Sequence, residues 1–273
     1  MNKTVEPREK RVSSESPSET SKRPKVSVAA WVSSSTQNAD TNALPPPTTC
    51  TEACIQDRDS TFIGYVYPLH TASSAYRSAL LEHLTHVVHP SIPTSQLPPQ
   101  FQHVAPTRRG STHDMYAYRV MQLKPGRSGL GGPNDFGTDE GQDDDGETWG
   151  SEKIMRVIRA MGASDVLVIV SRWYGGQLLG PVRFEHITHV ARAALQKHLD
   201  LEVIHEYRVR LQKLDESICA MKNVMKHSDS YENLTLDRAR RLVVARSKTL
   251  ATLRRKHSEE VNTNVAQQDL SRI

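Results

Sequence analysis

The sequence predicts one domain that contains both β-strands and α-helices, with a disordered segment before it and a helical tail after it. Residues 166–170 form an unbroken β-branched and aliphatic run, which is typical of a strand buried on both faces. Residues 112–120 alternate in the manner of a second strand, with Tyr116 and Tyr118 on the same face. Apolar residues from 207 to 225 recur at spacings of four and three, which predicts a coiled-coil seam.

Composition divides the chain into three parts, at residues 1–54, 55–205 and 206–273. The first part is rich in Ser, Thr, Pro and charge and has no apolar period, so we expect it to be disordered. Basic residues exceed acidic ones by one in the first part and by five in the third, whereas acidic residues exceed basic ones by two in the middle part. The pI of 8.9 therefore reflects mainly the tail.

Cysteine usage and apolar patterning predict a soluble intracellular protein. Cys50, Cys54 and Cys219 are too few for a disulfide framework or a four-cysteine zinc site. The chain shows neither a signal peptide nor an apolar run of about 20 residues that could span a bilayer. We therefore expect a cytoplasmic protein, with a nuclear location as the alternative, and no membrane association.

Two predicted helices accompany the predicted strands. A strand over residues 61–69 leads to a helix that Ser73 or Ser74 would cap. A second helix should be capped by Ser151 and should end at Gly162, just before the buried strand. Three histidines recur every third residue on the first helix and suggest either a metal site or, as we favour, a solvated face: His83, His86 and His89.

An acidic turn precedes the second helix. Seven acidic residues and no basic one lie from Asp135 to Glu147, so these carboxylates must be solvated, paired or bound to metal. The calcium-loop pattern fits poorly because its first position would be Gly141. A two-metal hydrolase lacks a nucleophile or base beside the cluster. We favour an ion pair in which Asp145 or Glu147 meets Arg172, at the end of the buried strand.

A glycine-rich junction follows the buried strand and leads into a helix that should end near residue 199. Gly175 and Gly176 permit a sharp turn, and Pro181 suits the first turn of the helix. Such a loop could hold a phosphate, but neither the dinucleotide nor the Walker pattern is present. Residues 172–174, an Arg with two aromatics, would equally suit stacking on a base or contact with a protein.

The sequence of the tail predicts two helices, with a break at residues 228–233. These helices either fold back as a hairpin or pair with another chain. Eight basic residues lie from 238 to 256, with Asp237 the one acidic residue beside them. They indicate either a solvated coiled-coil face or binding to RNA phosphates. The candidate nucleic-acid residues are Arg238, Arg240, Arg241, Arg254, Arg255 and Lys256.

Three separated motifs closely resemble the Impact N-terminal domain family in its eukaryotic form. They are THDMYAYR at 112–119, DDGET at 144–148 and the segment 170–187 that contains VSRWYGG, LLGP, RF and HI. They occur in the family's order, and the resemblance spans residues 61–199. It implies an α+β fold in which a mixed sheet carries helices on one face, like the second domain of ribosomal protein five.

The resemblance also implies a role in translational control. Eukaryotic relatives inhibit the starvation-responsive kinase that phosphorylates a translation initiation factor, by competing for the kinase's ribosome-associated activator, and are linked to actin. Their RWD domain, which is expected to engage the activator, is replaced here by the Ser/Thr/Pro-rich arm. Bacterial relatives, suspected of binding nucleic acid, carry a ferredoxin-like domain where this chain has basic helices.

We therefore expect a non-enzymatic interaction module with no catalytic residue, no metal and no cofactor. Its expected partners are proteins of translation control, above all the kinase activator on the ribosome, with actin, RNA or the ribosome as further partners; the tail could self-associate. RNA or ribosome binding by the tail is the first alternative, and a metal-dependent hydrolase at the acidic turn is the second. The expected binding residues are Arg172, Trp173, Tyr174, Gly175, Gly176, Asp144, Asp145, Gly146, Glu147, His113, Arg119 and Arg183.

Overall fold

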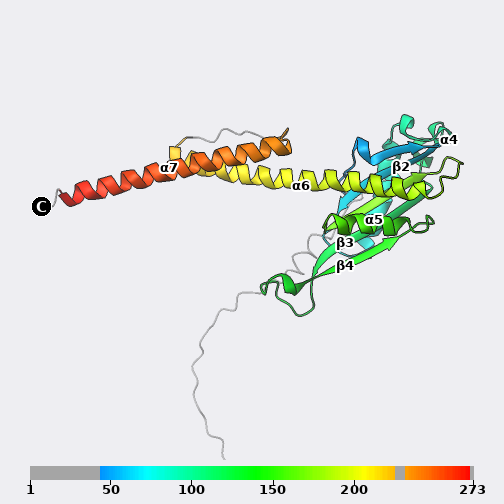
Figure 1. Cartoon of the computed structure of the whole chain (residues 1–273), viewed down its shortest axis with the longest axis horizontal. Helices are drawn as coiled ribbons and strands as arrows, with labels where there is room; N and C mark the ends of the chain where they lie inside the picture. The colour runs from blue at the N-terminus through cyan, green and yellow to red at the C-terminus, as the bar shows by residue number, and fades with distance from the viewer. Residues whose placement is uncertain (1–43, 225–230, 271–273) are drawn as a thin grey trace, which may run out of the picture. The chain divides into compact units, whose positions relative to one another are not determined.

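The computed structural model describes the backbone of residues 44–224 and 231–270 and the side chains of these ranges as far as residue 259 (Figure 1). Most of the arm that the sequence predicts to be disordered, residues 1–43, lies outside the described residues, and so does 225–230. Described structure begins before the expected boundary at residue 55. Leu44 is buried, and Thr48 exchanges two backbone hydrogen bonds of 2.8 and 2.9 Å with Val66. Residues 44–54 therefore belong to the folded unit.

The described residues contain one five-stranded sheet, with strand order β1-β2-β5-β3-β4. The α+β class is confirmed, but the expectation of a mixed sheet is wrong, because all four pairings are antiparallel. β5 enters the sheet between β2 and β3 and runs opposite to both, which leaves no parallel neighbours. The strands are β1 (Cys54–Asp57), β2 (Ser60–Pro68), β3 (His113–Leu123), β4 (Phe136–Asp143) and β5 (Val166–Trp173).

Two helices cover one face of the sheet, α5 (Gly150–Ala160) and the first half of α6 (Val182–Lys222). Gly162, two residues after the last residue of α5, has a left-handed φ of +65° and terminates the helix, as the sequence predicts. α6 lies directly on β2 because Gly64 has no side chain: a Cβ there would lie 2.3 Å from the carbonyl oxygen of Val190. The apolar residues of β5 on this face are Val166, Val168 and Val170.

The opposite face is also covered, so the expectation of helices on one face only is wrong. α2 (Ser74–His83) is capped by Ser73, whose side chain accepts a hydrogen bond from the Tyr76 N–H, as predicted. A π-helical turn, η3 (Leu84–Val88), and two short helices, α3 (His89–Ser91) and α4 (Pro99–Gln102), continue this layer. The second core forms because β5 is apolar on both sides; it contains Tyr65, Tyr67, Leu167, Ile169 and Trp173 among others.

The predicted solvated histidine face is wrong for two of its three members. His83 is buried with its Nδ1 atom 2.8 Å from the Tyr67 hydroxyl, and His89 is buried with its Nε2 atom 3.1 Å from Ser171 Oγ. Burial lowers the pKa of both imidazoles. Only His86 is exposed. These side chains therefore organise the second core rather than a metal face.

α6 extends well past its expected end near residue 199 and crosses the expected domain boundary at 205 without a break. α7 (Leu236–Leu270) packs against its second half through Leu211, Leu234, Ala239 and Val243. The predicted seam is therefore present, but the pair is no antiparallel hairpin. Figure 1 shows both helices running in the same direction, with α7 continuing past the end of α6. None of the described helices is long and apolar enough to cross a membrane.

The short helical turns are η2 (Thr51–Ala53), η4 (Thr94–Gln96), η5 (Pro106–Arg108) and η6 (Pro133–Asp135).

Candidate functional site

A buried carboxylate lies where β5, the acidic turn and α6 meet. Glu147 is only 6% exposed, and Arg172 is equally buried. One carboxylate oxygen of Glu147 pairs with Arg172 Nη1, and the other lies 2.6 Å from Arg183 Nε. We call these three residues the Glu147 clamp. The predicted ion pair between the acidic turn and the central strand is thus present, and Glu147 rather than Asp145 makes it.

Aromatic rings hold the two guanidinium groups of the clamp in place. The guanidinium of Arg172 lies 5.2 Å from the ring centroids of both Phe62 and Tyr174. That of Arg183 lies 4.3 Å from the Phe184 ring and donates a 3.0 Å hydrogen bond to the Gly180 carbonyl. Cations over aromatic faces are stabilised electrostatically, more so when they are desolvated. The clamp therefore joins the acidic turn, the end of β5 and the start of α6.

Asp144 organises the start of α5. Its carboxylate accepts hydrogen bonds from the Trp149 N–H at 3.0 Å, the Ser151 N–H at 2.9 Å and the Ser151 hydroxyl at 2.6 Å. Partial burial acts to raise the pKa of Asp144, but the hydrogen bonds from Ser151 and Trp149 outweigh it, so the pKa lies below its usual value. The prediction that Ser151 caps this helix is wrong, because Asp144 satisfies the free N–H groups instead.

The other carboxylates of the acidic turn bind backbone groups. Asp143 accepts from the Asp145 N–H at 2.8 Å, and Asp145 accepts from the Asp114 N–H at 2.6 Å. His113 lies opposite Arg172 in the sheet, and its Nδ1 atom is 2.6 Å from the Asp145 carbonyl oxygen. Gly146 has φ +83°, and a Cβ there would lie 3.2 Å from the His113 ring. His113, Asp145 and Gly146 thus lie together in one hydrogen-bonded turn.

The carboxylates that the hydrolase alternative requires are therefore committed to α5, β3 and two arginines. Among the residues described, no group of three or more His, Cys, Asp or Glu side chains is placed to hold a metal ion.

The glycine loop after β5 is fastened to the turn between β1 and β2. A Cβ on Gly175 would lie 1.9 Å from the Asp59 carbonyl oxygen, and the Gly175 N–H donates to Ser60 Oγ at 3.1 Å. The Tyr174 N–H donates to Thr112 Oγ1 at 3.0 Å. Gly176 has φ +87°, which only glycine adopts without strain. The amides of Tyr174 and Gly175 are therefore already bonded within the protein and are not free to bind a phosphate.

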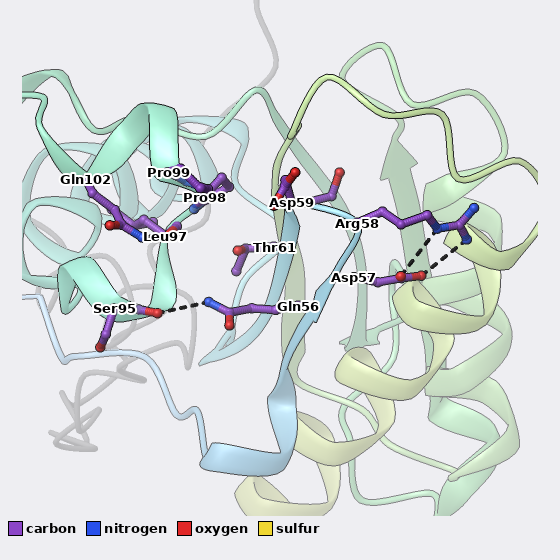
Figure 2. A pocket seen from close by; sticks show the side chains of 11 residues that line it. Gln56, Asp57, Arg58, Asp59, Thr61, Ser95, Leu97, Pro98, Pro99 and Gln102 are labelled. Atoms are coloured by element: carbon purple, nitrogen blue, oxygen red, sulfur yellow. Dashed lines mark hydrogen bonds and ion pairs between the residues drawn. The ribbon is translucent and has the colours of Figure 1, made fainter.

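A polar cavity of about 290 Å³ lies beside the β1–β2 turn. Figure 2 shows Gln56 reaching across it toward Ser95, whose carbonyl oxygen accepts a 3.1 Å hydrogen bond, while Arg58 pairs with Asp57. His186 also donates to Asp57 at 2.9 Å and, as the largest contribution, lowers the pKa of that carboxyl. The lining residues are Gln56, Asp57, Arg58, Asp59, Ser60, Thr61, Ser95, Leu97, Pro98, Pro99 and Gln102.

Two of the expected binding residues lie elsewhere. Trp173 is 0% exposed in the second core, and its indole N–H donates to the Arg109 carbonyl at 3.0 Å. Strand alternation explains this, since neighbours on β5 face opposite sides of the sheet. Arg119 lies opposite Val166, at the other end of β5, and pairs with Glu140 at 3.1 Å. Neither residue can belong to an exposed surface at the clamp.

Two exposed apolar residues that are not among the expected binding residues lie close to the clamp in sequence. Trp149 is 63% exposed and follows Glu147 by two positions, while Leu178 is 86% exposed and precedes Arg183 by five. The Glu147–Arg183 ion pair brings together the segments that carry them. Leu178 and Leu179 are indistinguishable by pattern, yet only Leu179 enters the core. Trp149 could have been identified from the sequence, because it is a large aromatic residue in an otherwise polar turn.

The candidate nucleic-acid residues all lie on α7, and their side chains are exposed: Arg238, Arg240, Arg241, Arg254, Arg255 and Lys256.

Together, the antiparallel sheet, its two layers of helices and the internal ion clamp define an α+β domain. The chain belongs to the Impact N-terminal domain family, which it matches over residues 58–195. The matched segment contains every residue of the Glu147 clamp and also Trp149 and Leu178.

Relatives carry the same family name. Protein IMPACT of Xenopus laevis is 36% identical over 107 residues, which are 39% of this chain and 31% of that protein. An IMPACT family member of Schizosaccharomyces pombe is 30% identical over 201 residues, 74% of this chain and 53% of that one. Among solved structures, the two-domain translational regulator Yih1 is 27% identical with a TM-score of 0.31, covering 66% of this chain and 54% of that chain. The chain thus spans about a third to a half of the length of these relatives.

Proposed function

We propose that this protein regulates translation by binding a protein partner through the surface around the Glu147 clamp. The observation that carries the proposal is the exposure of Trp149, two residues after Glu147, and of Leu178, five residues before Arg183, in segments that the ion pairs of the clamp join. Large apolar side chains on a fixed support are typical of the energetic centre of protein interfaces. Tyr174, half-buried against Arg172, extends this surface.

The translational part of the proposal is supported by family membership and by the description of Yih1 as a translational regulator. The partner we favour is the ribosome-associated activator of the starvation-responsive initiation-factor kinase. Occupying that activator would keep it from the kinase and lower phosphorylation of the initiation factor. Actin is a further partner, and the cytoplasm is the proposed site of action.

A binding role suits the chemistry of the junction better than catalysis does. A general acid or base needs a carboxylate within reach of a substrate proton. Here Asp144 binds Ser151 and the Trp149 N–H, Asp145 binds the Asp114 N–H, and Glu147 is paired on both oxygens. These carboxylates shape the surface and hold it rigid.

The test measures phosphorylation of the initiation factor in amino-acid-starved cells that express the full chain or the double variant Trp149→Ala/Leu178→Ala. We expect the wild-type chain to lower the phosphorylated fraction and the variant to lose most of this effect, since interface anchors often contribute about 2 kcal/mol or more each. A matched control is Met121→Ala/Leu130→Ala, which removes two exposed apolar side chains from the β3 end and the following loop.

Equal suppression by the double variant and the control would overturn the proposed surface. A translation reporter in the same cells separates the two levels of the proposal. A response of the reporter without a change in phosphorylation would overturn the kinase step, and no response of either readout would overturn a role in translation.

A further inference from the structure

α7 carries a concentration of positive charge that the folded domain does not use. From residue 236 to 259 it contains eight Lys or Arg and two Asp or Glu residues. Arg246 is committed to the helix pair through an ion pair of 2.8 Å with Asp215. The other seven basic side chains are all exposed. These seven side chains therefore place positive charge in solvent along most of the described part of α7.

Three of these residues form a straight stripe. Arg241, Lys248 and Arg255 recur every seven residues, which is close to two turns, so they lie on one side of the helix. The opposite side carries the buried residues Ala239, Val243 and Leu250. At 1.5 Å per residue, the stripe extends over about 21 Å.

Packing against α6 fixes the direction in which the stripe points. Arg208 of α6 donates a 3.2 Å hydrogen bond to the Tyr231 carbonyl just before α7, and Asp215 pairs with Arg246. These contacts and the apolar seam hold the inner face of α7 on α6. Arg255 also lies 3.8 Å from Glu259, but both side chains are largely exposed, and such a pair contributes little.

We propose that the outward face of α7 binds double-stranded RNA through its phosphate backbone, without regard to base sequence. A row of guanidinium and ammonium groups complements the regular negative charge of a duplex. Residues 236–270 contain no Phe, Tyr or Trp, so α7 lacks the aromatic platforms on which proteins that bind single strands usually stack the bases. A-form RNA is recognised mainly by shape and phosphate contacts, which this face can supply.

A membrane surface is a poorer match for the same charges. Helices that lie in a membrane interface insert an apolar face among the lipids. Here the apolar face of α7 is covered by α6 at Ala239 and Val243. The choice of RNA over other duplexes rests on the proposed role in translation, whereas the site rests on α7 alone.

The test is fluorescence anisotropy of the purified full chain with labelled RNA duplexes of roughly 20 base pairs, in two unrelated sequences. We expect equal affinity for both duplexes and a slope of log K against log salt of about −3, one phosphate contact for each residue of the stripe. The triple variant Arg241→Gln/Lys248→Gln/Arg255→Gln should lose at least about tenfold in affinity near 100 mM salt, with a slope nearer zero.

A matched control changes the same net charge elsewhere, with Arg108→Gln/Arg192→Gln/Lys197→Gln at three exposed positions of the domain. It should bind as the wild-type chain does. Equal losses in the two triple variants, a preference for one duplex sequence, or tighter binding to phosphatidylserine vesicles than to RNA would each overturn the proposal. The starved-cell experiment uses Trp149 and Leu178, so either proposal can fail without the other.

Discussion

The domain buries some of its basic side chains, whereas the tail keeps most of its basic side chains in solvent. In the domain, Arg172 is buried against Glu147 and two aromatic rings, and it joins three segments of the chain. In the tail, Arg241, Lys248 and Arg255 stay in solvent while apolar residues make the contacts. An arginine in the first setting should determine stability, and one in the second should determine binding. Residue type alone does not separate these roles; burial does.

The domain also has more apolar packing than the tail. The sheet carries a core on each face, whereas the helix pair of the tail is held by a small cluster that includes Leu211, Leu234, Ala239 and Val243. Stability should therefore be high in the domain and low in the tail, with the two able to unfold separately even though α6 runs through both.

The largest effect is expected at the clamp. Arg172→Ala should lower the free energy of unfolding by roughly 3 to 5 kcal/mol, because it leaves the buried Glu147 carboxylate with one partner fewer. Denaturant unfolding followed by tryptophan fluorescence measures this, and a loss below about 1 kcal/mol would show that water replaces the arginine.

A smaller, local effect is expected in the tail. Leu211→Ala removes a fully buried side chain from the tail cluster and should destabilise the helix pair by about 2 to 3 kcal/mol. Hydrogen exchange should accelerate in α7 while the domain strands remain protected. Equal acceleration in β5 would show that the two regions unfold as one unit.

The cap of α5 should contribute less again. Asp144→Ala should lower the free energy of unfolding by about 1 to 2 kcal/mol, because the N–H groups of Trp149 and Ser151 lose their acceptor. Since the folded-state pKa of Asp144 lies below its usual 3.8, its contribution is complete above pH 3.8 and is lost as the pH falls through the folded value. The variant should show a weaker acid dependence in this range; an unchanged acid profile would contradict the role.

The smallest effect on stability is expected from the charge stripe. The triple variant Arg241→Gln/Lys248→Gln/Arg255→Gln should change the free energy of unfolding by no more than about 0.5 kcal/mol, because these side chains are exposed and Gln favours helix as they do. Circular dichroism during thermal unfolding checks this. A larger loss would mean that the stripe supports the helix pair itself.

Much of the domain follows from sequence pattern because its central elements are strongly periodic. β2, β3, β5 and α5 lie close to their predicted positions, and the ion pair at Arg172 follows from charge complementarity. β4 was missed because Phe136–Asp143 is acidic and glycine-rich, and pairing with β3 rather than composition makes it a strand.

The candidate site was harder to predict because burial depends on both faces of the sheet. The sequence suggests that Trp173 is presented beside Arg172, but Trp173 is buried in the second core, where the ring of His89 in α3 lies 4.9 Å from it. The apolar run predicts burial of residues 166–170 on both faces, but it ends before Trp173 and does not show that the second layer extends over that residue. The direction of α7 was equally out of reach, because a heptad seam serves parallel and antiparallel pairs alike.

The most direct test of the account is a double-mutant cycle on Glu147 and Arg172, measured by denaturant unfolding of the full chain. We infer that this junction is an internal clamp that supports the proposed binding surface. We expect Glu147→Leu and Arg172→Met each to lower the free energy of unfolding strongly, and the double variant to lose less than the sum by roughly 1 to 3 kcal/mol. Additive losses would contradict it, because they would show that the two charges act independently.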